Sequence, residues 1–418
     1  MTAPPVLETP LLPRVKTPRG RTRRGLLGHS PALDGLRGVA LILVLIYHFT
    51  GVAGPLPGGW SGVDVFFVLS GFLITALLLD ERKLLGRVAL ARFYARRGLR
   101  LLPALLVMLT VWSALLLAFH GQNWFGAVPN GSKAGGTVDV LPALGHVALV
   151  LTYGINWVHA LFHGHAPLGH LWSLAVEEQF YLVWPFTLLF FLRLPTARRV
   201  WPVLALAAAS AALPFFLYDG GAGKNRIYFG TDTRAVGLLL GAAAALIWHR
   251  RRSRGLPARL PAVRAWMGVA FVAGVAVYLA NLPAKFVVAP ALLGLAVSQV
   301  VPYLVDHPTS VMGRALSPRW LTWVGKRSYA LYLWHYLWAT WTHTMPLSYG
   351  MPIGVAGALA CTALSWKFVE APCLRYAVRF KAPSAVQRDL PVTTNAYRFN
   401  PARAVTAVAE TGTSSLAG

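Results

Sequence analysis

Ten long apolar stretches run through the sequence, and they constrain the fold more than any other feature. Each is close to the ~20 apolar residues that a helix needs to cross about 30 Å of hydrocarbon. Only 13% of the 418 residues are charged, against about 25% in an ordinary soluble domain, so we expect most of the surface to face lipid. The sequence predicts an all-α membrane bundle of about ten transmembrane helices, at residues 36–53, 63–79, 101–119, 171–192, 200–218, 235–249, 265–282, 286–304, 328–343 and 350–366.

Positive charge is concentrated in alternate connections between these stretches. With ten helices, 34 of the 39 Lys and Arg residues lie on one side of the membrane. Because cytoplasmic loops are enriched in Lys and Arg, we expect this side, and both termini, to be cytoplasmic. The net charge of +25 therefore reports orientation and predicts no nucleic-acid partner. The five remaining cations fall in the opposite connections, at Lys133, Lys224, Arg226, Arg234 and Lys285.

An eleventh apolar stretch, residues 140–156, is shorter and is broken by Gly145 and Gly154. If it crossed the membrane, every later connection would change sides and the basic run at 250–254 would lie outside. We therefore expect it to be re-entrant or interfacial, within a long outer segment, residues 120–170, between the third and fourth spans.

The two ends of the chain differ in composition from the part between them. Residues 1–30 are basic, residues 381–418 are poor in large apolar side chains, and both are expected to be disordered cytoplasmic segments. Residues 31–380 are then the transmembrane domain.

Polar side chains within the apolar stretches are candidates for function, because each costs free energy in hydrocarbon unless it is paired. Arg37 and His48 are eleven residues apart, which places them on one helix face, about 16 Å from each other. This face would carry a cation at the cytoplasmic rim and an imidazole deep in the membrane. The structural alternative makes Arg37 a snorkelling anchor and His48 a histidine bonded to a neighbouring helix.

The fourth stretch contains two adjacent carboxylates. His170, Ser173 and Glu177 fall on one helical face, and Glu178 and Tyr181 fall on the adjoining face. Adjacent acids at this depth suit proton handling. The alternative is that one acid pairs with an arginine and holds the bundle together.

Four further polar or amphipathic residues lie in other stretches. Asp64 is near the outer rim of the second stretch and Ser70 is midway along it, whereas Trp334 and His335 lie within 328–343. Each alone is as readily structural as functional, and we treat them as supporting or acceptor-side candidates.

A basic segment, residues 92–103, connects the second and third stretches on the cytoplasmic face. Its guanidinium groups suit bidentate phosphate binding. Attraction to anionic lipid headgroups is an equally physical explanation. The four arginines are Arg92, Arg96, Arg97 and Arg100.

Four histidines of the outer segment, His159, His163, His165 and His170, could suggest zinc. They lack regular spacing and obvious carboxylate partners, and the two cysteines form no thiolate site. We expect no metal and no permanently bound cofactor.

Several ordered blocks resemble the acyltransferase-3 family of membrane O-acyltransferases, over residues 31–380. They are LDGLRG at 33–38 leading to His48, GVDVFFVLSGFLIT at 62–75, RFYARR at 92–97 leading to Pro103, HLWSLAVEEQFY at 170–181 and SYALYLWH at 328–335. The resemblance implies a ten-helix bundle in the bacterial plasma membrane. It also implies that Arg37 and His48 are essential, and that acyl-coenzyme A is the co-substrate that donates the acyl group.

Many bacterial relatives carry a soluble hydrolase-like domain after the bundle. Here the tail is short and polar, so we expect the bundle to perform the whole reaction. His48 would be the general base, Glu177 or Glu178 would orient it or handle protons, and an acyl-histidine intermediate is the alternative to direct transfer. The acceptor would carry a hydroxyl group and could be a glycan, a glycolipid or a glycosylated metabolite such as a macrolide.

Two other classes of protein compete with this interpretation. A proton-coupled transporter would also use intramembrane His and Glu residues, but it predicts internal repeats, and the glycine-rich and basic blocks occur once each. A membrane scaffold without catalytic function gives no reason for buried carboxylates.

The charge distribution makes a direct prediction about topology. Cysteine introduced by Ser132→Cys or Ser348→Cys should react with an impermeant thiol reagent outside the cell, whereas Ser253→Cys or Ser317→Cys should not. The unsubstituted protein, with Cys361 and Cys373, sets the background. External labelling at position 253 would mean that residues 140–156 cross the membrane.

Overall fold

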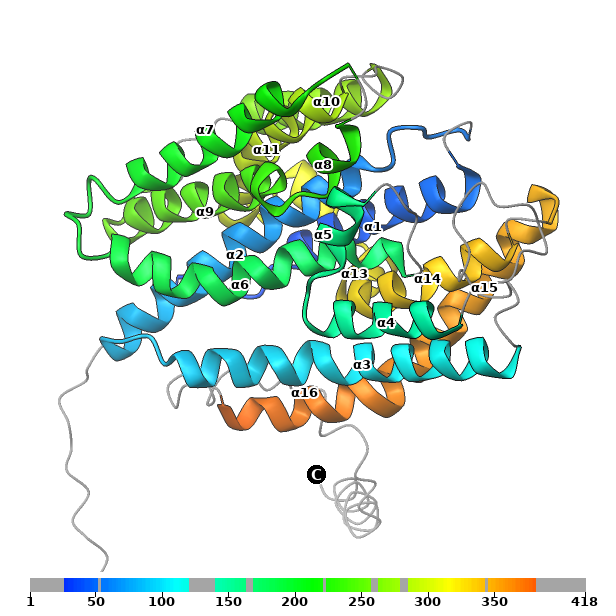
Figure 1. The fold of residues 1–418 in the computed structure, drawn as a ribbon. Coiled ribbons are helices and arrows are strands. Elements are labelled where there is room, and N and C mark those ends of the chain that lie inside the picture. The colour runs from blue at the N-terminus through cyan, green and yellow to red at the C-terminus, as the bar shows by residue number, and fades with distance from the viewer. Residues whose placement is uncertain are drawn as a thin grey trace, which may run out of the picture.

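The computed structural model describes residues 26–51, 54–119, 140–162, 168–220, 223–256, 262–278, 285–342 and 345–380. Over these residues the chain forms a bundle of helices that lie roughly along one direction (Figure 1). The ten longest helices are α1 (Pro31–Thr50), α2 (Ser61–Leu85), α3 (Leu90–Ala118), α6 (Trp172–Phe191), α7 (Val200–Leu217), α9 (Thr231–Ser253), α10 (Ala262–Tyr278), α11 (Lys285–Asp306), α14 (Ser328–Thr342) and α15 (Leu347–Ser365).

Short helices connect and extend the long ones. They are α4 (Val140–Leu151), α5 (Ile155–Leu161), η1 (Gly169–Leu171), α8 (Lys224–Phe229), α12 (Val311–Ala315), α13 (Arg319–Lys326), the π-helical turn η3 (Trp366–Glu370), α16 (Ala371–Ala377) and η4 (Val378–Phe380). Several predictions fall outside the described residues: residues 1–25, the tail from 381, His163, His165, and Ser132 with its neighbours at 120–139.

The prediction of an all-α membrane fold is confirmed. Eight helical segments of the described residues are long and apolar enough to cross a membrane, or nine if one sharply bent pair counts as a span. Each of the ten predicted stretches overlaps a helix. However, α10 and α14 have only 17 and 15 residues, so their length alone does not identify them as spans.

Helix α6 runs in the same direction as α2. Ser70 of α2 donates a hydrogen bond to Glu177 of α6 (3.0 Å). Further along both helices, Trp184 donates to Thr75 (2.8 Å). From the first contact to the second, the residue numbers increase in both helices, so α2 and α6 run parallel. Helix α3 is antiparallel to α6, since Tyr94 bonds to Leu182 and Arg97 to Glu178. The start of α6 therefore lies at the end of the bundle at which α3 finishes.

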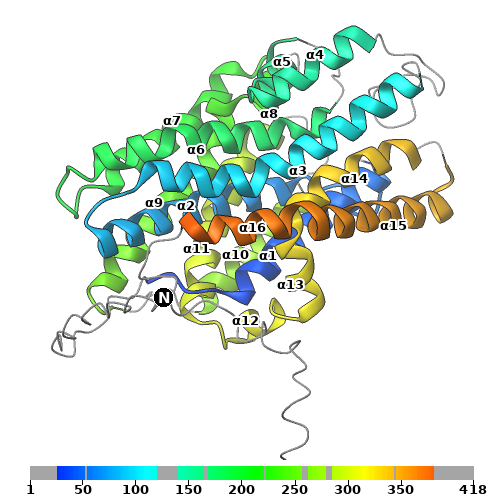
Figure 2. The same cartoon turned by 90° about the horizontal axis from the view of Figure 1, so that it is seen from below.

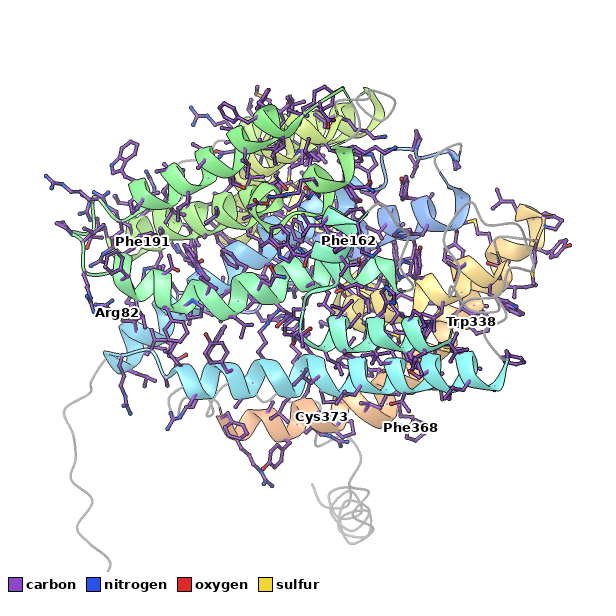
Figure 3. All side chains as sticks on the ribbon, viewed as in Figure 1. Arg82, Phe162, Phe191, Trp338, Phe368 and Cys373 are labelled. Atoms are coloured by element: carbon purple, nitrogen blue, oxygen red, sulfur yellow. The ribbon has the colours of Figure 1, made fainter. Side chains whose placement is uncertain are left out.

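The same direction is visible in the side-chain view. Arg82, near the end of α2, and Phe191, at the end of α6, lie at one end of the molecule, whereas Trp338 lies toward the other (Figure 3). Between α3 and α6, helices α4 and α5 meet at an angle of 117°, which is the geometry of a broken or re-entrant segment.

Hydrogen bonds hold this bent segment against α6. Gln179 Nε2 donates to the carbonyl of Tyr153 (2.6 Å) and to Asn156 Oδ1 (2.9 Å), and Thr231 of α9 donates to Gln179 Oε1 (2.5 Å). Tyr153 has a positive φ of 56°, a conformation that non-glycine residues rarely adopt, at the point where the chain reverses. The network joins the bend to the helix that carries Glu177 and Glu178.

Helix α2 is the most enclosed of the long apolar helices, and it crosses α9 at very close range. A methyl group at Gly71 would lie 1.9 Å from the Leu238 carbonyl oxygen, and one at Gly241 would lie 2.1 Å from the Val68 carbonyl oxygen. Small residues allow two helix backbones to approach this closely in a membrane. The two glycines therefore set the distance between α2 and α9.

A buried ion pair connects the same two helices. Arg234 Nη2 lies 2.9 Å from Asp64 Oδ1, and both side chains are 1% exposed. The assignment of Arg234 to a connecting loop is wrong, because it lies one turn inside α9. The rings of Phe67, Trp172 and Tyr228 lie 5.3–5.7 Å from its guanidinium carbon. A cation needs such partners where water is excluded.

The basic segment at 92–103 is not a separate surface helix. It forms the first three turns of α3, which continues through Pro103 into the apolar stretch. Helix α16 runs along this part of α3 (Figures 1 and 2), and Arg96 Nη1 donates to the carbonyl of Phe380 (2.9 Å). The C-terminal helix thus covers one side of the basic segment.

The glycine contacts lead to a stability prediction. Gly71→Ala should lower the thermal unfolding midpoint in detergent, because the new methyl group clashes with backbone and overpacking costs about 1–3 kcal/mol or more. Gly274→Ala is the matched control: nothing lies within 4 Å of its added methyl group, and alanine favours a helix by about 0.5–1 kcal/mol over glycine. Equal effects of the two substitutions would contradict the close crossing.

Candidate active site

Two histidines from helices distant in sequence meet in the bundle. His48 of α1 and His335 of α14 have their Nδ1 and Nε2 atoms 3.1 Å apart. The other ring nitrogen of His335, Nδ1, lies 2.7 Å from the carbonyl oxygen of Tyr332. His335 is completely buried, whereas His48 is half-buried. The predicted base is therefore bonded to a second histidine that belongs to the SYALYLWH block.

The partners of these rings assign their tautomers. A carbonyl oxygen only accepts hydrogen bonds, so Nδ1 of His335 carries the proton. Neutral His335 then has a lone pair on Nε2, and Nδ1–H of His48 donates to it. The remaining nitrogen of His48, Nε2, is left with a free lone pair. A histidine held in this way can accept a proton from a substrate hydroxyl.

A third imidazole and two hydroxyl groups adjoin this pair. The ring of His170 lies 5.9 Å from that of His335, and its own nitrogens have no hydrogen-bond partner among the described residues. Tyr332 donates to the carbonyl of His170 (2.5 Å), and its hydroxyl is 2.7 Å from that of Ser173. The predicted residues His170, Ser173 and His335 are thus brought together with His48.

Glu177 lies deeper along α6 and receives two hydroxyl groups. Ser70 donates to its Oε1 (3.0 Å) and Tyr181 donates to its Oε2 (3.3 Å). Glu177 makes no ion pair with the residues described, and it is only half-buried. This carboxylate is therefore held by neutral donors and remains free to take part in proton transfer.

Glu178 has a different role, although it is the next residue. Two guanidinium nitrogens of Arg97 donate to its carboxylate: Nη2 lies 2.7 Å from Oε1, and Nε lies 3.2 Å from Oε1 and 3.4 Å from Oε2. The same guanidinium covers the ring of Tyr181, 3.2 Å from its centre. For Glu178, the structural alternative raised by the sequence matches the geometry: this acid pairs with an arginine and joins α3 to α6.

Arg37 and Arg100 lie beside the Arg97–Glu178 pair, and neither forms an ion pair shorter than 3.9 Å with a described carboxylate. Arg100 is exposed, and Arg37, Arg97 and Asp34 are among its charged neighbours. Arg37 Nη1 lies 3.9 Å from Asp34 Oδ1, a carboxylate that also contacts His29. Two guanidinium groups therefore remain available for an anion at this end of the bundle.

The other two arginines of the basic segment do not join this cluster through any described contact. Arg96 forms an ion pair with Glu81 (3.1 Å) in addition to its bond to the Phe380 carbonyl. Arg92 is exposed on the surface of α3. Asp64 is likewise removed from the histidines, in its ion pair with Arg234. Trp334 is buried next to His335, with an indole N–H that has no partner among the described residues.

The sequence analysis missed a buried carboxylate at the same end as Arg100. Glu370 is 5% exposed, accepts a hydrogen bond from Ser365 (3.1 Å), and has Arg100 and Arg327 as charged neighbours. It ends the π-helical turn η3, and such turns are frequent at functional sites. An acid four residues past the last apolar stretch was visible in the sequence, but nothing there indicated that it turns inward.

Several of these side chains are incompletely buried. His48, Glu177 and Tyr332 are each half-buried, so part of each side chain remains accessible.

The histidines do not assemble a metal site among the described residues. No group of three or more His, Cys, Asp or Glu side chains in this part of the chain could hold a metal ion. His159 is buried beside the ring of Phe229, and His170 stacks on Tyr336.

The family of the chain follows from comparison with known proteins. The model of the acyltransferase-3 family, described as an acyltransferase domain, matches residues 30–369. This match covers most of the chain and contains all the predicted site residues, from Arg37 to His335, whereas Glu370 lies just beyond it. The protein therefore belongs to the acyltransferase-3 family. No solved structure matches it.

Curated relatives are similar across most of this chain. Peptidoglycan O-acetyltransferase OatA of Listeria monocytogenes is 34% identical over 84% of the chain and 57% of its own length. A putative peptidoglycan O-acetyltransferase of Bacillus subtilis is 36% identical over 74% of the chain and 48% of its own length. A putative O-acetyltransferase of Staphylococcus aureus is 30% identical, with 85% and 59% covered. The chain spans about half the length of these relatives.

Breaking the buried ion pair between Glu178 and Arg97 should lower the stability of the protein more than breaking an exposed ion pair. Glu178→Gln leaves the Arg97 guanidinium without a counter-ion and should cost about 3–5 kcal/mol, seen as a lower unfolding midpoint in detergent. Asp232→Asn is the matched control: it breaks the ion pair between Asp232 and Arg226, whose side chains are 39% and 25% exposed, and exposed pairs contribute about 0–1 kcal/mol. A control that destabilises as much as Glu178→Gln would contradict the structural role of Glu178.

Proposed function

We propose that the protein is a multi-pass acyltransferase of the bacterial plasma membrane. It moves an acyl group, acetyl or another short acyl, from cytoplasmic acyl-coenzyme A to a hydroxyl of a carbohydrate, a glycolipid or a glycosylated metabolite such as a macrolide. The observation that carries the proposal is the pairing of His48 with His335, which leaves Nε2 of His48 free, on the helix that also carries Arg37. Membership of the acyltransferase family favours this function over proton-coupled transport.

The donor binds at the cationic end of the bundle. Arg37 and Arg100 contact its phosphate groups, with Arg97 beside them, and a guanidinium can bind a phosphate through two hydrogen bonds. About 16 Å of helix separates Arg37 from His48, which is close to the length of an extended pantetheine arm. The thioester can therefore reach His48 while the nucleotide end stays at the rim.

The histidine pair performs the proton transfer. Nε2 of His48 removes the proton of the acceptor hydroxyl as its oxygen attacks the thioester carbonyl carbon. The carbon–sulfur bond then breaks, and the thiolate takes up the proton from the imidazolium. His335 stabilises the imidazolium through the bond from Nδ1–H of His48. Attack by His48 itself, giving an acyl-histidine, uses the same free lone pair.

Glu177 supports the same reaction from α6. Its carboxylate is held by Ser70 and Tyr181 rather than by a cation, so it can exchange protons with the reacting groups. Glu178 acts through Arg97, which it holds beside Arg37 and Arg100. Glu177 thus handles protons, and Glu178 positions a donor-binding arginine.

The acceptor lies on the opposite side of the membrane from the donor. Ten crossing helices with both termini in the cytoplasm put the basic first part of α3 inside and the ends of α1 and α3 outside. The names of the relatives in Listeria and Bacillus specify peptidoglycan, which favours a cell-wall glycan as the acceptor and acetyl as the acyl group.

The proposal is tested by release of free coenzyme A from acetyl-coenzyme A. Purified protein in detergent or lipid vesicles should release thiol only when a hydroxyl acceptor is present, and mass spectrometry should find the acceptor heavier by one acetyl group. Candidate acceptors are glycan fragments, glycolipids and macrolide glycosides. Thiol release that does not depend on any of them, or no release at all, would contradict the proposed reaction.

Substitutions of the histidine pair give a sharper prediction. His48→Ala should lower kcat by a factor of about 10²–10⁴ or more, since it removes the general base, while the protein stays folded in the membrane. His335→Gln keeps an oxygen that can accept from Nδ1–H of His48, whereas His335→Phe does not. The glutamine variant should therefore be more active than the phenylalanine variant at equal donor KM.

The control for these variants is His146→Ala, because His146 bonds only to the carbonyl of Pro142 on its own helix. It should retain full activity. Near-normal turnover of His48→Ala, or equal activity of the two His335 variants, would remove the histidine pair from the mechanism.

A further inference from the structure

Two tyrosines contact His48, and a third lies next to one of them. The rings of Tyr47 and Tyr336 meet that of His48 edge-on, with centres 5.6 and 5.4 Å away. Tyr228 of α8 has Tyr47 among its neighbours, and its ring lies 4.4 Å from that of Phe286. Phe286 and Tyr47 both pack against the cluster around Trp60, so the three tyrosines belong to one region.

The hydroxyl groups of these tyrosines are unusual among their neighbours. None of the three makes a hydrogen bond with any described residue, although all three are half-buried. Other tyrosines near the site do have partners: Tyr329 donates to Leu101 and Tyr332 to His170. An unpaired phenol within an apolar bundle is unfavourable, and three of them in one region beside His48 point to a polar occupant.

Aromatic faces complete the walls of this region. The ring of Trp172 lies 4.8 Å from that of Tyr228 and 5.4 Å from that of Phe229. Ligand sites are typically lined by apolar and aromatic side chains with a few well-placed polar groups. A sugar ring matches such walls, because its C–H faces pack on aromatic rings while its hydroxyls point to polar groups at the edge.

We infer that Tyr47, Tyr228 and Tyr336 form the acceptor subsite, and that it binds a sugar bearing several hydroxyl groups. One sugar hydroxyl is presented to Nε2 of His48, while the others bond to the tyrosine hydroxyls. This inference rests on the proposed acyl transfer. It narrows the acceptor to a carbohydrate and places it on the side of His48 opposite the donor arginines.

The test uses substitutions that remove only a hydroxyl group. Tyr47→Phe, Tyr228→Phe and Tyr336→Phe are assayed with acetyl-coenzyme A and two probe acceptors, the tetrasaccharide of N-acetylglucosamine and 1-octanol, which has a single hydroxyl. Each substitution should raise KM for the tetrasaccharide about tenfold, the effect of one lost hydrogen bond, and leave KM for acetyl-coenzyme A unchanged. Transfer to 1-octanol should change less than twofold.

Tyr349→Phe is the matched control, because Tyr349 is 51% exposed on α15 and should have no effect. Unchanged tetrasaccharide KM in all three variants, or loss of octanol and tetrasaccharide transfer in parallel, would overturn the subsite while the proposed function stands. Wild-type protein that prefers 1-octanol to the tetrasaccharide would overturn it in the same way. Wild-type protein that acetylates neither probe nor any other hydroxyl compound would overturn the proposed function itself.

Discussion

A hydrocarbon environment leaves the polar groups of this bundle only protein partners, and the arrangement of the helices follows from that constraint. Glu178 and Arg97 join α6 to α3, Asp64 joins α2 to α9 through Arg234, and His48 joins α1 to α14 through His335. Each pair connects helices that are distant in sequence. Close packing at glycines such as Gly71 brings the backbones near enough for these short bonds to form.

The polar groups outside these three pairs make up the proposed site. Arg37 and Arg100 form no ion pair shorter than 3.9 Å with a described carboxylate at one end, Glu177 is held by hydroxyls in the middle, and His48 keeps one nitrogen that does not bond to His335 beyond it. Such groups are costly in a membrane unless a substrate uses them. Their order along the bundle matches a reaction in which an anionic thioester and a hydroxyl acceptor approach from opposite ends.

Local sequence patterns were sufficient to predict much of this molecule, but not the choice of partners. Apolar stretches about 20 residues long located the helices, and loop charge predicted that residues 140–156 are re-entrant or interfacial, where the structure has the bent pair α4 and α5. The Arg37 and His48 face followed from helical periodicity. The hydrogen-bond partners of these side chains were not predictable from local patterns, because His48 and His335, for example, are 287 positions apart in the sequence. Arg234 lies just before a predicted stretch and was therefore assigned to a loop, and no local pattern indicated that Glu370 faces inward.

The proposed mechanism requires one bundle to transfer an acyl group from a cytoplasmic thioester to an acceptor on the other side of the membrane. Sidedness can be measured with protein reconstituted in one orientation in lipid vesicles, with radiolabelled acetyl-coenzyme A and a glycan acceptor in separate compartments. Labelled glycan should appear only when the thioester is on the side of the basic run Arg250–Arg254 and the glycan is on the opposite side. Transfer that requires both substrates in one compartment, or the reverse arrangement, would contradict the account.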